Sequence, residues 1–287
     1  MLGSGIRFVL AVGLCMAALL STALGTAAPV RAQNLAWLGG DTVEIAPNRM
    51  GLNGSQSNEP LLGYLAKPEA PGRHPAVVVL HGCGGFSANY PVIADVLKSY
   101  GYVALALDSL GEANACVPHG LGSLVEAHDA YTALDWLTRQ DFVNPDRVAV
   151  LGFSMGAKAV FNDVQAGGGA AEKAERRHFS AAIGFYPNCR SRAGIMTVPT
   201  LILVGDKDDW ALASWCREMM ARRNGKGAPV KLVIYPGATH AFNVPGRTRD
   251  YLGHHLAYDP QATAAAWKEV REFLQMTLDA TPAAESR

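Results

Sequence analysis

Ser154 lies in a pentapeptide whose glycine spacing is typical of an activated nucleophile. Residues 152–156 have the pattern G-x-S-x-G; they follow the apolar segment 147–151 and precede residues 157–164, which we predict to form a helix. A tight turn between a strand and a helix lifts the serine hydroxyl above the edge of a sheet, and a side chain at either glycine would collide with the flanking backbone. A serine hydroxyl is a weak nucleophile at neutral pH, so Ser154 needs a base that accepts its proton.

Candidates for this base, and for an acid that orients it, follow two later strand-like segments. Residues 205–210 contain three carboxylates: Asp206, Asp208 and Asp209. His240 follows the next such segment, whereas His254 and His255 lie in a part of the chain that is less clearly linked to a strand. Ligands bind at the carboxyl ends of parallel strands, and the chain order Ser, Asp, His is one in which a sheet assembles a triad. We therefore predict a triad of Ser154, His240 and one of the three aspartates.

Residues 81–85, with the sequence HGCGG, supply a fourth element of such a site. Their glycines permit backbone N–H groups to point toward a substrate. An oxyanion hole takes one N–H from this loop and one from the residue after the nucleophile. We assign these two donors to Cys83 and Met155. The alternative is that residues 81–85 form only a tight turn.

The segments that position these residues alternate between strand and helix patterns. Apolar, β-branched runs predict strands buried on both faces of a sheet, with two shorter candidates before them. The expected strands are 42–46, 61–66, 75–80, 102–107, 147–151, 181–186, 200–204 and 230–235. Apolar residues at three- and four-residue steps predict helices within 124–137 and 267–278. We therefore expect an α/β fold, with a mostly parallel central sheet and helices on both faces.

The composition excludes several other classes of protein. The chain has 287 residues, with 25 Lys plus Arg balanced by 25 Asp plus Glu, and no dense basic run of the kind that binds nucleic acid. Its 49% hydrophobic residues argue against a disordered chain. The cysteines show no C-x-x-C spacing, so neither a zinc site nor a dithiol redox site is indicated.

The first 32 residues are predicted to be an export signal that is removed. Arg7 precedes an uncharged apolar stretch, residues 8–20, and Val30-Arg31-Ala32 fits a cleavage site before Gln33. Cleavage after Ala28 and retention as an uncleaved membrane anchor are the alternatives. We expect a periplasmic or secreted protein with no nucleic-acid partner and no stable membrane span once the leader is gone. The oligomeric state is left open.

The rest of the chain is predicted to be one domain. No linker or shift in composition divides residues 33–278, and residues 279–287 are expected to be a flexible tail. Residues 166–177 are an irregular insertion rich in alanine, glycine and charged residues. They form either a small lid beside the site or a solvated surface excursion.

Four of these segments together resemble the dienelactone hydrolase family of α/β-hydrolases. The resemblance covers roughly residues 61–278. It is carried by VVVLHGCGG at 77–85, GFSMG at 152–156, GDKDDW at 205–210 and YPGATHAF at 235–242. The family carries its triad acid in a G-x-x-D pattern, which selects Asp208 over Asp206 and Asp209. The resemblance also implies the α/β-hydrolase fold.

The implied reaction is acyl transfer from a carboxylic ester or lactone in two halves. His240 takes the proton of Ser154 as the serine attacks the carbonyl, and Asp208 holds the imidazole. The N–H groups of Cys83 and Met155 receive the oxyanion. Water then releases the acyl group from Ser154. The expected partner is a small-molecule ester, and neither a metal nor an organic cofactor is needed.

Two features differ from the name-giving members of the family. Those members use a cysteine nucleophile held by a nearby glutamate, whereas this chain has Ser154 and, near the place of that glutamate, His81. The arginines that hold the dienelactone carboxylate in those members have no matching position here. The namesake substrate therefore does not follow from the resemblance, whereas ester hydrolysis does.

The four cysteines that remain after removal of the leader are an even set, which an oxidising compartment can pair. The resemblance and the positions of the loops imply the bonds Cys83–Cys116 and Cys189–Cys216. Each bond would restrain loops that form the site, and would stabilise the fold mainly by reducing the number of conformations open to the unfolded chain. The alternative is four free thiols.

Three other functions remain open. The same triad can act on a peptide, a thioester or a polyester. The chain could instead be a non-catalytic secreted binding protein, although such a protein would usually lack a member of the triad. The third alternative is a thiol-dependent enzyme centred on Cys83, for which the sequence places no base.

Overall fold

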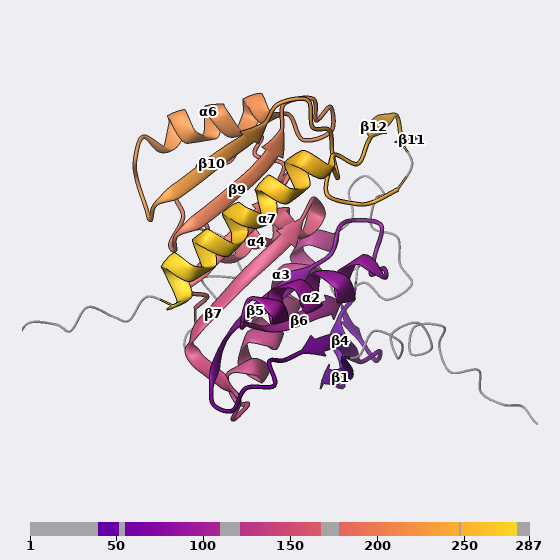
Figure 1. Cartoon of the computed structure of the whole chain (residues 1–287), viewed down its shortest axis with the longest axis vertical. Helices are drawn as coiled ribbons and strands as arrows, with labels where there is room; N and C mark the ends of the chain where they lie inside the picture. The colour runs from indigo at the N-terminus through magenta and orange to yellow at the C-terminus, as the bar shows by residue number, and fades with distance from the viewer. Residues whose placement is uncertain (1–39, 52–54, 110–120, 168–177, 247, 280–287) are drawn as a thin grey trace, which may run out of the picture.

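An eight-stranded sheet forms the centre of the structure. The computed structural model describes residues 40–51, 55–109, 121–167, 178–246 and 248–279, and Figure 1 shows the sheet between helices on its two faces. The strand order is β1-β4-β6-β5-β7-β8-β9-β10. In chain order the strands are β1 (Asp41–Ala46), β4 (Leu61–Ala66), β5 (His74–Leu80), β6 (Val103–Asp108), β7 (Val143–Phe153), β8 (Ala181–Phe185), β9 (Thr200–Gly205) and β10 (Val230–Tyr235).

The carboxyl ends of six parallel strands, β5 to β10, meet at one edge of this sheet. β4 pairs antiparallel with β1 and β6, and the other neighbouring strands are parallel. The last residues of neighbouring strands lie close to one another, with Leu80 opposite Gly152 and Tyr235 opposite Gly205. The loops that follow β5, β7, β8, β9 and β10 therefore share the surface where parallel sheets bind ligands.

Helices cover both faces of the sheet and bury two separate apolar cores. They are α2 (Asn89–Ser99), α3 (Gly122–Leu137), α4 (Met155–Val164), α6 (Ala213–Arg223) and α7 (Pro260–Leu274), followed by a π-helical turn (Gln275–Asp279). Side chains alternate between the two faces along each strand. In β5, Val77 and Val79 belong to the core that also contains side chains of α2 and α7, whereas Val78 and Leu80 belong to the core that contains side chains of α3, α4 and α6. In Figure 1, α2 and α7 lie in front of the sheet.

The fold class predicted from the sequence is confirmed, and each predicted strand is present. β7 extends beyond its predicted end at residue 151, as far as Phe153. The structure adds helix α2 and two small hairpins: β2 (Arg49–Met50) with β3 (Gln56–Ser57), and β11 (Arg249–Tyr251) with β12 (His254–Leu256). The predicted leader, residues 168–177 of the insertion and the tail from residue 280 lie outside the described residues. Within the described part, no helix is long and apolar enough to span a membrane.

Helix α7 begins well before residue 267, where its apolar pattern starts in the sequence. The carboxylate of Asp259 accepts the N–H groups of Gln261 and Ala262, which have no acceptor within the helix. Pro260 occupies the first helical position, where a missing N–H costs nothing. These local signals, rather than the apolar period, determine where the helix starts.

Three carboxyl groups are buried where α3 packs against α4. Glu126 and Asp129 lie on α3 and Asp163 lies on α4, and each of them is at most 1% exposed. Burial raises the pKa of each carboxyl group above its ordinary value, because the charged form loses its hydration there. The oxygens of the Asp163 carboxyl group find no hydrogen-bond partner among the described residues. The folded protein therefore favours the protonated form of these side chains.

We expect Asp163→Asn to make the stability of the protein less dependent on pH. Because burial raises the pKa of Asp163 above 3.8 in the folded protein, the unfolded chain releases this proton first as the pH rises. The stabilising effect of the bound proton is complete below the unfolded pKa and is lost as the pH rises from there through the folded pKa, so the wild-type free energy of unfolding falls over that range. Asparagine does not titrate. The variant should therefore gain stability relative to the wild type between about pH 5 and about pH 8.

Urea unfolding of both proteins at the two pH values measures this difference. Asp135→Asn, at an exposed position of α3, is the matched control and should show no such gain. If the Asp163→Asn variant differed from the wild type by the same free energy at both pH values, Asp163 would be ionised in the folded state and the prediction would be wrong.

Candidate active site

The turn that carries Ser154 has the geometry of a nucleophile elbow. β7 ends at Phe153 and α4 begins at Met155, and Ser154 between them has φ 52° and ψ −106°. A Cβ at Gly152 would overlap the backbone of Gly156, and a Cβ at Gly156 would overlap carbonyl groups at the end of β5. Both glycines of the G-x-S-x-G pattern are therefore required by the close approach of the backbone.

The structure brings Ser154, Asp208 and His240 into one line of hydrogen bonds. His240 Nε2 lies 2.9 Å from Ser154 Oγ, and His240 Nδ1 lies 2.8 Å from Asp208 Oδ2. When Nδ1–H donates to the carboxylate, Nε2 is left as an acceptor for the serine hydroxyl. Asp208 and His240 are 2% and 4% exposed, so the attraction between them is little weakened by water.

The loops after β9 and β10 pack together as one unit. A Cβ at Gly205, the last residue of β9, would overlap the backbone of Ala238 in the loop after β10. The N–H of Lys207 donates to the Ala238 carbonyl at 3.0 Å, and the N–H of Gly237 donates to the Asp206 carboxylate at 2.6 Å. These contacts fix the position of His240 relative to its acid.

Only one of the three candidate acids faces His240. Asp208 Oδ1 accepts the N–H groups of Trp210 at 2.9 Å and Ala211 at 2.6 Å, which leaves Oδ2 for the imidazole. Asp209 instead accepts an N–H from β12 at 3.2 Å. The backbone turn after β9 thus selects the same aspartate that the family pattern selects.

Two aromatic rings enclose the imidazole of His240. The ring centroid of Tyr186 lies 4.6 Å from that of His240, and the ring centroid of Trp210 lies 5.1 Å from it. The Tyr186 hydroxyl donates to the side-chain oxygen of Asn243 at 2.7 Å, and burial raises the pKa of Tyr186, which keeps this proton in place. The role of Tyr186 was not predicted. The one signal in the sequence is its position at the carboxyl end of a predicted strand.

The N-terminus of α4 directly follows the nucleophile in the chain. Met155 is the first residue of the helix, so its N–H has no acceptor within α4. The aligned peptide dipoles also place partial positive charge at this end of the helix, which stabilises a developing anion. This arrangement suits the predicted role of Met155 as an oxyanion donor.

Two hydrogen bonds hold the loop after β5 beside the nucleophile turn. The N–H of Gly156 donates to the His81 carbonyl at 3.1 Å, and the N–H of Gly82 donates to the Tyr90 hydroxyl at 2.7 Å. Tyr90 lies on α2, and nothing in the sequence pointed to it. Because Cys83 directly follows Gly82, its predicted role as the second oxyanion donor depends on these contacts.

The side chain of His81 is fully buried beneath this loop. Its Nδ1 lies 2.8 Å from the carbonyl oxygen of Gly82 and 3.1 Å from Glu126 Oε1. The His81 side chain therefore links this loop to α3.

Disulfide bonds brace the loops around the site. Cys189 and Cys216 form the bond that the resemblance implied, with their Cα atoms 4.9 Å apart, and it joins the segment after β8 to α6. Cys83 is also disulfide-bonded, and its predicted partner, Cys116, lies outside the described residues. A bonded Cys83 has no thiol available as a nucleophile. The alternative of a thiol-dependent enzyme centred on Cys83 is therefore wrong.

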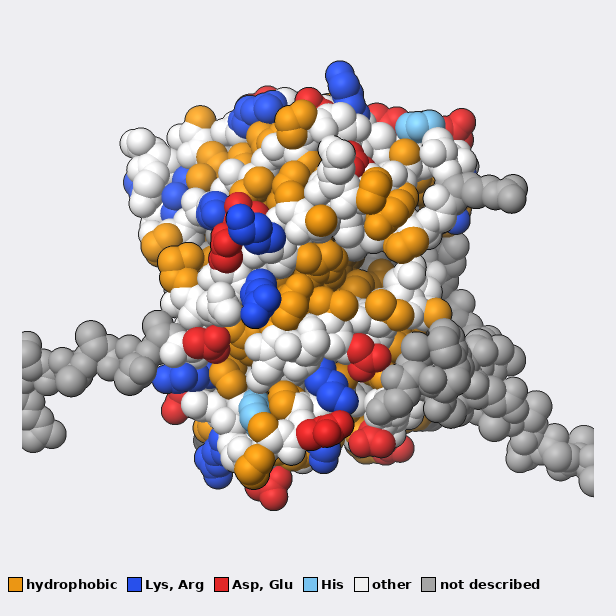
Figure 2. Space-filling view, viewed as in Figure 1, with side chains coloured by type: hydrophobic (Ala, Val, Ile, Leu, Met, Phe, Trp, Pro, Cys, Tyr) orange, Lys and Arg blue, Asp and Glu red, His pale blue; other side chains and the backbone are white. Residues whose placement is uncertain are grey.

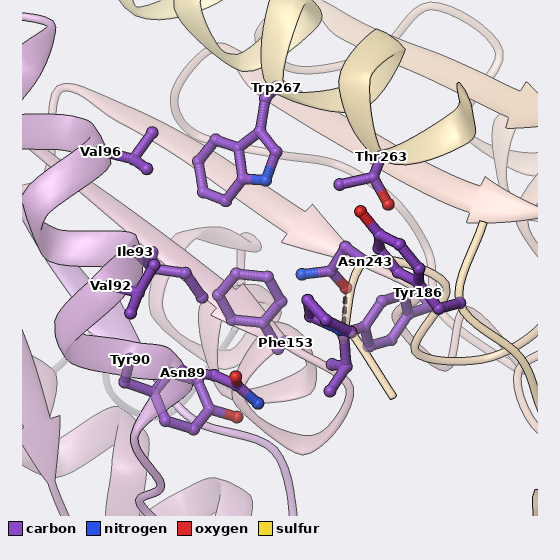
Figure 3. Close-up of a pocket in the computed structure, with 13 residues that line it drawn as sticks. Asn89, Tyr90, Val92, Ile93, Val96, Phe153, Tyr186, Asn243, Thr263 and Trp267 are labelled. Carbon is purple, nitrogen blue, oxygen red and sulfur yellow. Dashed lines mark hydrogen bonds between the residues drawn. The ribbon is translucent and has the colours of Figure 1, made fainter. Parts of the chain in front are cut away.

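A pocket with a volume of about 190 Å³ lies next to the nucleophile turn, between α2 and α7 (Figure 3). Phe153 and Tyr186, which flank Ser154 and His240, form part of its wall. No group of three His, Cys, Asp or Glu side chains in the described part of the chain is placed to hold a metal ion. The arrangement at the sheet edge is thus a serine hydroxyl hydrogen-bonded to a histidine, beside a small pocket.

Comparison with known proteins assigns the chain to a family. Residues 61–278 match the family described as "Dienelactone hydrolase family". A Bradyrhizobium protein named "Probable 2-oxo-3-(5-oxofuran-2-ylidene)propanoate lactonase" is 29% identical over 252 residues, which are 80% of this chain and 93% of that protein.

Solved structures share the fold at lower identity. A thermophilic esterase from Thermogutta terrifontis, Est2, has a TM-score of 0.64 at 20% identity, over 86% of this chain and 95% of that chain. The dienelactone hydrolase-like promiscuous phosphotriesterase P91 from metagenomic libraries has a TM-score of 0.65 at 21% identity, over 83% of this chain and 98% of that chain.

A lactone is a cyclic carboxylic ester, and the family match spans most of the chain. The protein therefore belongs to the dienelactone hydrolase family of α/β-hydrolases and is a carboxylic ester hydrolase.

Proposed function

We propose that the protein cleaves small carboxylic esters or lactones through an acyl-enzyme on Ser154. His240 Nε2 accepts the hydroxyl proton while Ser154 Oγ forms a bond to the substrate carbonyl carbon. The carbonyl oxygen becomes an oxyanion, which the N–H groups of Cys83 and Met155 stabilise. The bond to the alkoxy group then breaks, and that group leaves with the proton from His240.

The second half of the proposed reaction repeats these steps with water. His240 removes a proton from a water molecule that attacks the acyl carbon, and the same proton returns to Ser154 Oγ as the acid departs. Asp208 stabilises the imidazolium in both halves without itself accepting a proton. His240 carries every proton transfer in this scheme, and the N–H groups of Cys83 and Met155 only donate hydrogen bonds.

The observation that carries the proposal is the hydrogen-bonded line from Asp208 through His240 to Ser154, with distances of 2.8 and 2.9 Å. A buried acid, an imidazole that it orients and a hydroxyl in reach of the free ring nitrogen are the parts that turn serine into a nucleophile. The same line argues against a purely binding role, because ligand binding alone does not need this alignment.

A covalent probe tests the proposal directly. We expect paraoxon to inactivate the protein and to leave one diethylphosphoryl group on the peptide that contains Ser154, measured by mass spectrometry. The relative Thermogutta terrifontis esterase 2 has been solved as the enzyme phosphorylated by paraoxon. Urea-unfolded protein, in which the triad is not assembled, is the control and should not be labelled. Labelling only at other residues, or equal labelling of the unfolded chain, would contradict the proposal.

We also propose that the protein works outside the reducing cytosol. The leader-like residues 1–32 and the disulfide bond between Cys189 and Cys216 support this, since disulfides persist in oxidising compartments. N-terminal sequencing of protein from the periplasm or the medium should give a chain that begins at Gln33. Recovery of the full-length chain from the cytosol alone would count against export.

A further inference from the structure

The pocket between α2 and α7 adjoins the proposed catalytic machinery through three of its own wall residues. Phe153 immediately precedes Ser154 in the chain, and the ring of Tyr186 packs against His240 with centroids 4.6 Å apart. Tyr90, on the α2 side, accepts the N–H of Gly82 in the loop assigned to the oxyanion hole. A group bound in this pocket would therefore be separated from each part of the reacting centre by a single wall residue.

The size of the pocket limits what it can hold. Its volume is about 190 Å³. An apolar protein cavity of about 150 Å³ binds benzene. The pocket therefore has room for one six-membered ring, or an aliphatic group of that bulk, with a short linker toward Ser154.

The walls of the pocket are uncharged. Figure 3 shows an apolar end whose walls come from α2, α7 and the end of β7: Val92, Ile93, Val96, Phe153 and Trp267. The other end carries hydrogen-bonding side chains. The side-chain oxygen of Asn243 already accepts a hydrogen bond from the Tyr186 hydroxyl. The Thr263 hydroxyl lies within 3.1 Å of the backbone carbonyl oxygens of Phe242 and Asp259. None of the 13 described residues that line the pocket is Lys, Arg, Asp or Glu.

The rim of the pocket carries two exposed apolar side chains. Val92 is 49% exposed and Tyr258 is 39% exposed, and both line the pocket. Figure 2 shows hydrophobic side chains gathered in the hollow between α7 and α2. Contiguous exposed apolar surface of this kind marks a binding site for an apolar partner.

We propose that this pocket binds an uncharged, apolar, ring-sized group of the ester substrate and discriminates against the same group bearing a carboxylate. The inference rests on the proposed ester hydrolysis at Ser154. Burial of such a group removes apolar surface from water. A carboxylate would lose its hydration in the pocket without meeting a cation there. The preferred substrates are thus neutral esters that carry this apolar group on either the acyl or the alcohol side.

Two esters, each with a single ring, show whether the pocket binds the acyl group or the alcohol group of the substrate. Methyl phenylacetate carries the ring on the acyl side and benzyl acetate carries it on the alcohol side, with methyl acetate as the common reference. We expect one of the two to be hydrolysed with a kcat/KM about 10- to 100-fold above that of methyl acetate, in a pH-stat assay. The preferred ester with a carboxylate added to the para position of its ring should lose most of this gain.

Val96→Phe tests whether the gain comes from the pocket. The larger side chain, on the wall formed by α2, should fill the apolar end and abolish the preference for the ring over methyl acetate, with both esters measured on the same variant. Lys98→Phe, on the same helix but outside the pocket lining, is the matched control and should keep the preference. Val92→Arg, at the half-exposed rim, should raise activity on the carboxylated ester at least about tenfold, because the guanidinium pairs with the carboxylate.

The outcomes separate this inference from the proposed function. If methyl acetate is hydrolysed but neither ring-bearing ester is preferred, or if Val96→Phe keeps the preference, the pocket inference is overturned and the triad stands. If no ester is hydrolysed and paraoxon does not label Ser154, both are overturned. A preference that Val96→Phe removes and Lys98→Phe retains supports the pocket as the binding site.

Discussion

Ser154→Ala is expected to lower kcat/KM for a short-chain activated ester by about 10⁴- to 10⁶-fold. The loss is this large because the acyl-enzyme cannot form without the hydroxyl, and only oxyanion stabilisation and substrate binding remain to accelerate attack by water. The assay is the initial rate of hydrolysis of 4-nitrophenyl acetate by purified mature protein. The variant should also lose its labelling by paraoxon.

The fold of this variant is expected to be unchanged. Ser154 Oγ is hydrogen-bonded to His240, so its removal leaves one neutral ring nitrogen without that partner rather than an unpaired buried charge. Thermal unfolding followed by circular dichroism checks this point. Ser99→Ala, which removes an exposed hydroxyl on α2, is the control and should hydrolyse the ester at the wild-type rate. Undiminished turnover by Ser154→Ala would reject the proposed triad.

The second large effect is expected for Asp208→Asn, with a fall in kcat of about 10⁴-fold near neutral pH. Oδ1 of Asp208 accepts two backbone N–H groups, from Trp210 and Ala211, so an asparagine must place its amide oxygen there. Its NH₂ group then points at His240 Nδ1, which has to become an acceptor. The ring proton moves to Nε2, and the imidazole can no longer accept the proton of Ser154.

Asp209→Asn is the matched control for this variant. Asp209 is the adjacent residue, but its side chain is 47% exposed and is directed to the hairpin of β11 and β12, where it accepts the N–H of His255. We expect its kcat to stay within about threefold of the wild type. Equal losses in the two variants would mean that the whole loop after β9, rather than Asp208 itself, supports the reaction.

The buried sheet could be predicted from the sequence because its strands are apolar on both faces. Runs such as residues 75–80 leave few other structures open, and each became a strand of the parallel part of the sheet. Helix α2 was not predicted. Pro91 is typical of a residue that interrupts a helix. It lies in the first turn of α2, where its missing N–H has no acceptor to lose.

The candidate site could be predicted as far as the residues that perform chemistry, and not beyond. The strand-turn-helix setting of Ser154 and the order of the loops placed the nucleophile and His240 at one edge. The choice of Asp208 among three aspartates needed either the family pattern or the hydrogen bonds of its Oδ1 atom. Residue types alone do not reveal which carboxylate the turn directs inward.

The walls of the site could not be predicted, because they depend on contacts between distant segments. Tyr90 acts through Gly82, and Tyr186 through His240 and Asn243, which follows it by 57 residues. Trp267, which we expected to begin the apolar stripe of a helix, packs against the core from α7 and also lines the pocket. Such roles follow from how helices pack over the sheet edge, and local patterns do not encode that packing.

The backbone of Ser154 has a consequence for the protein's own stability. A residue with a Cβ at φ 52° and ψ −106° occupies a sparsely populated conformation that costs about 1–3 kcal/mol. Glycine would adopt it without this cost. The tight packing of β7 against α4 therefore supplies free energy that holds the serine where it can react, and a chain with glycine at position 154 would gain resistance to unfolding as it lost its chemistry. At position 154, the residue that would make the fold more stable is therefore not the residue that the reaction needs.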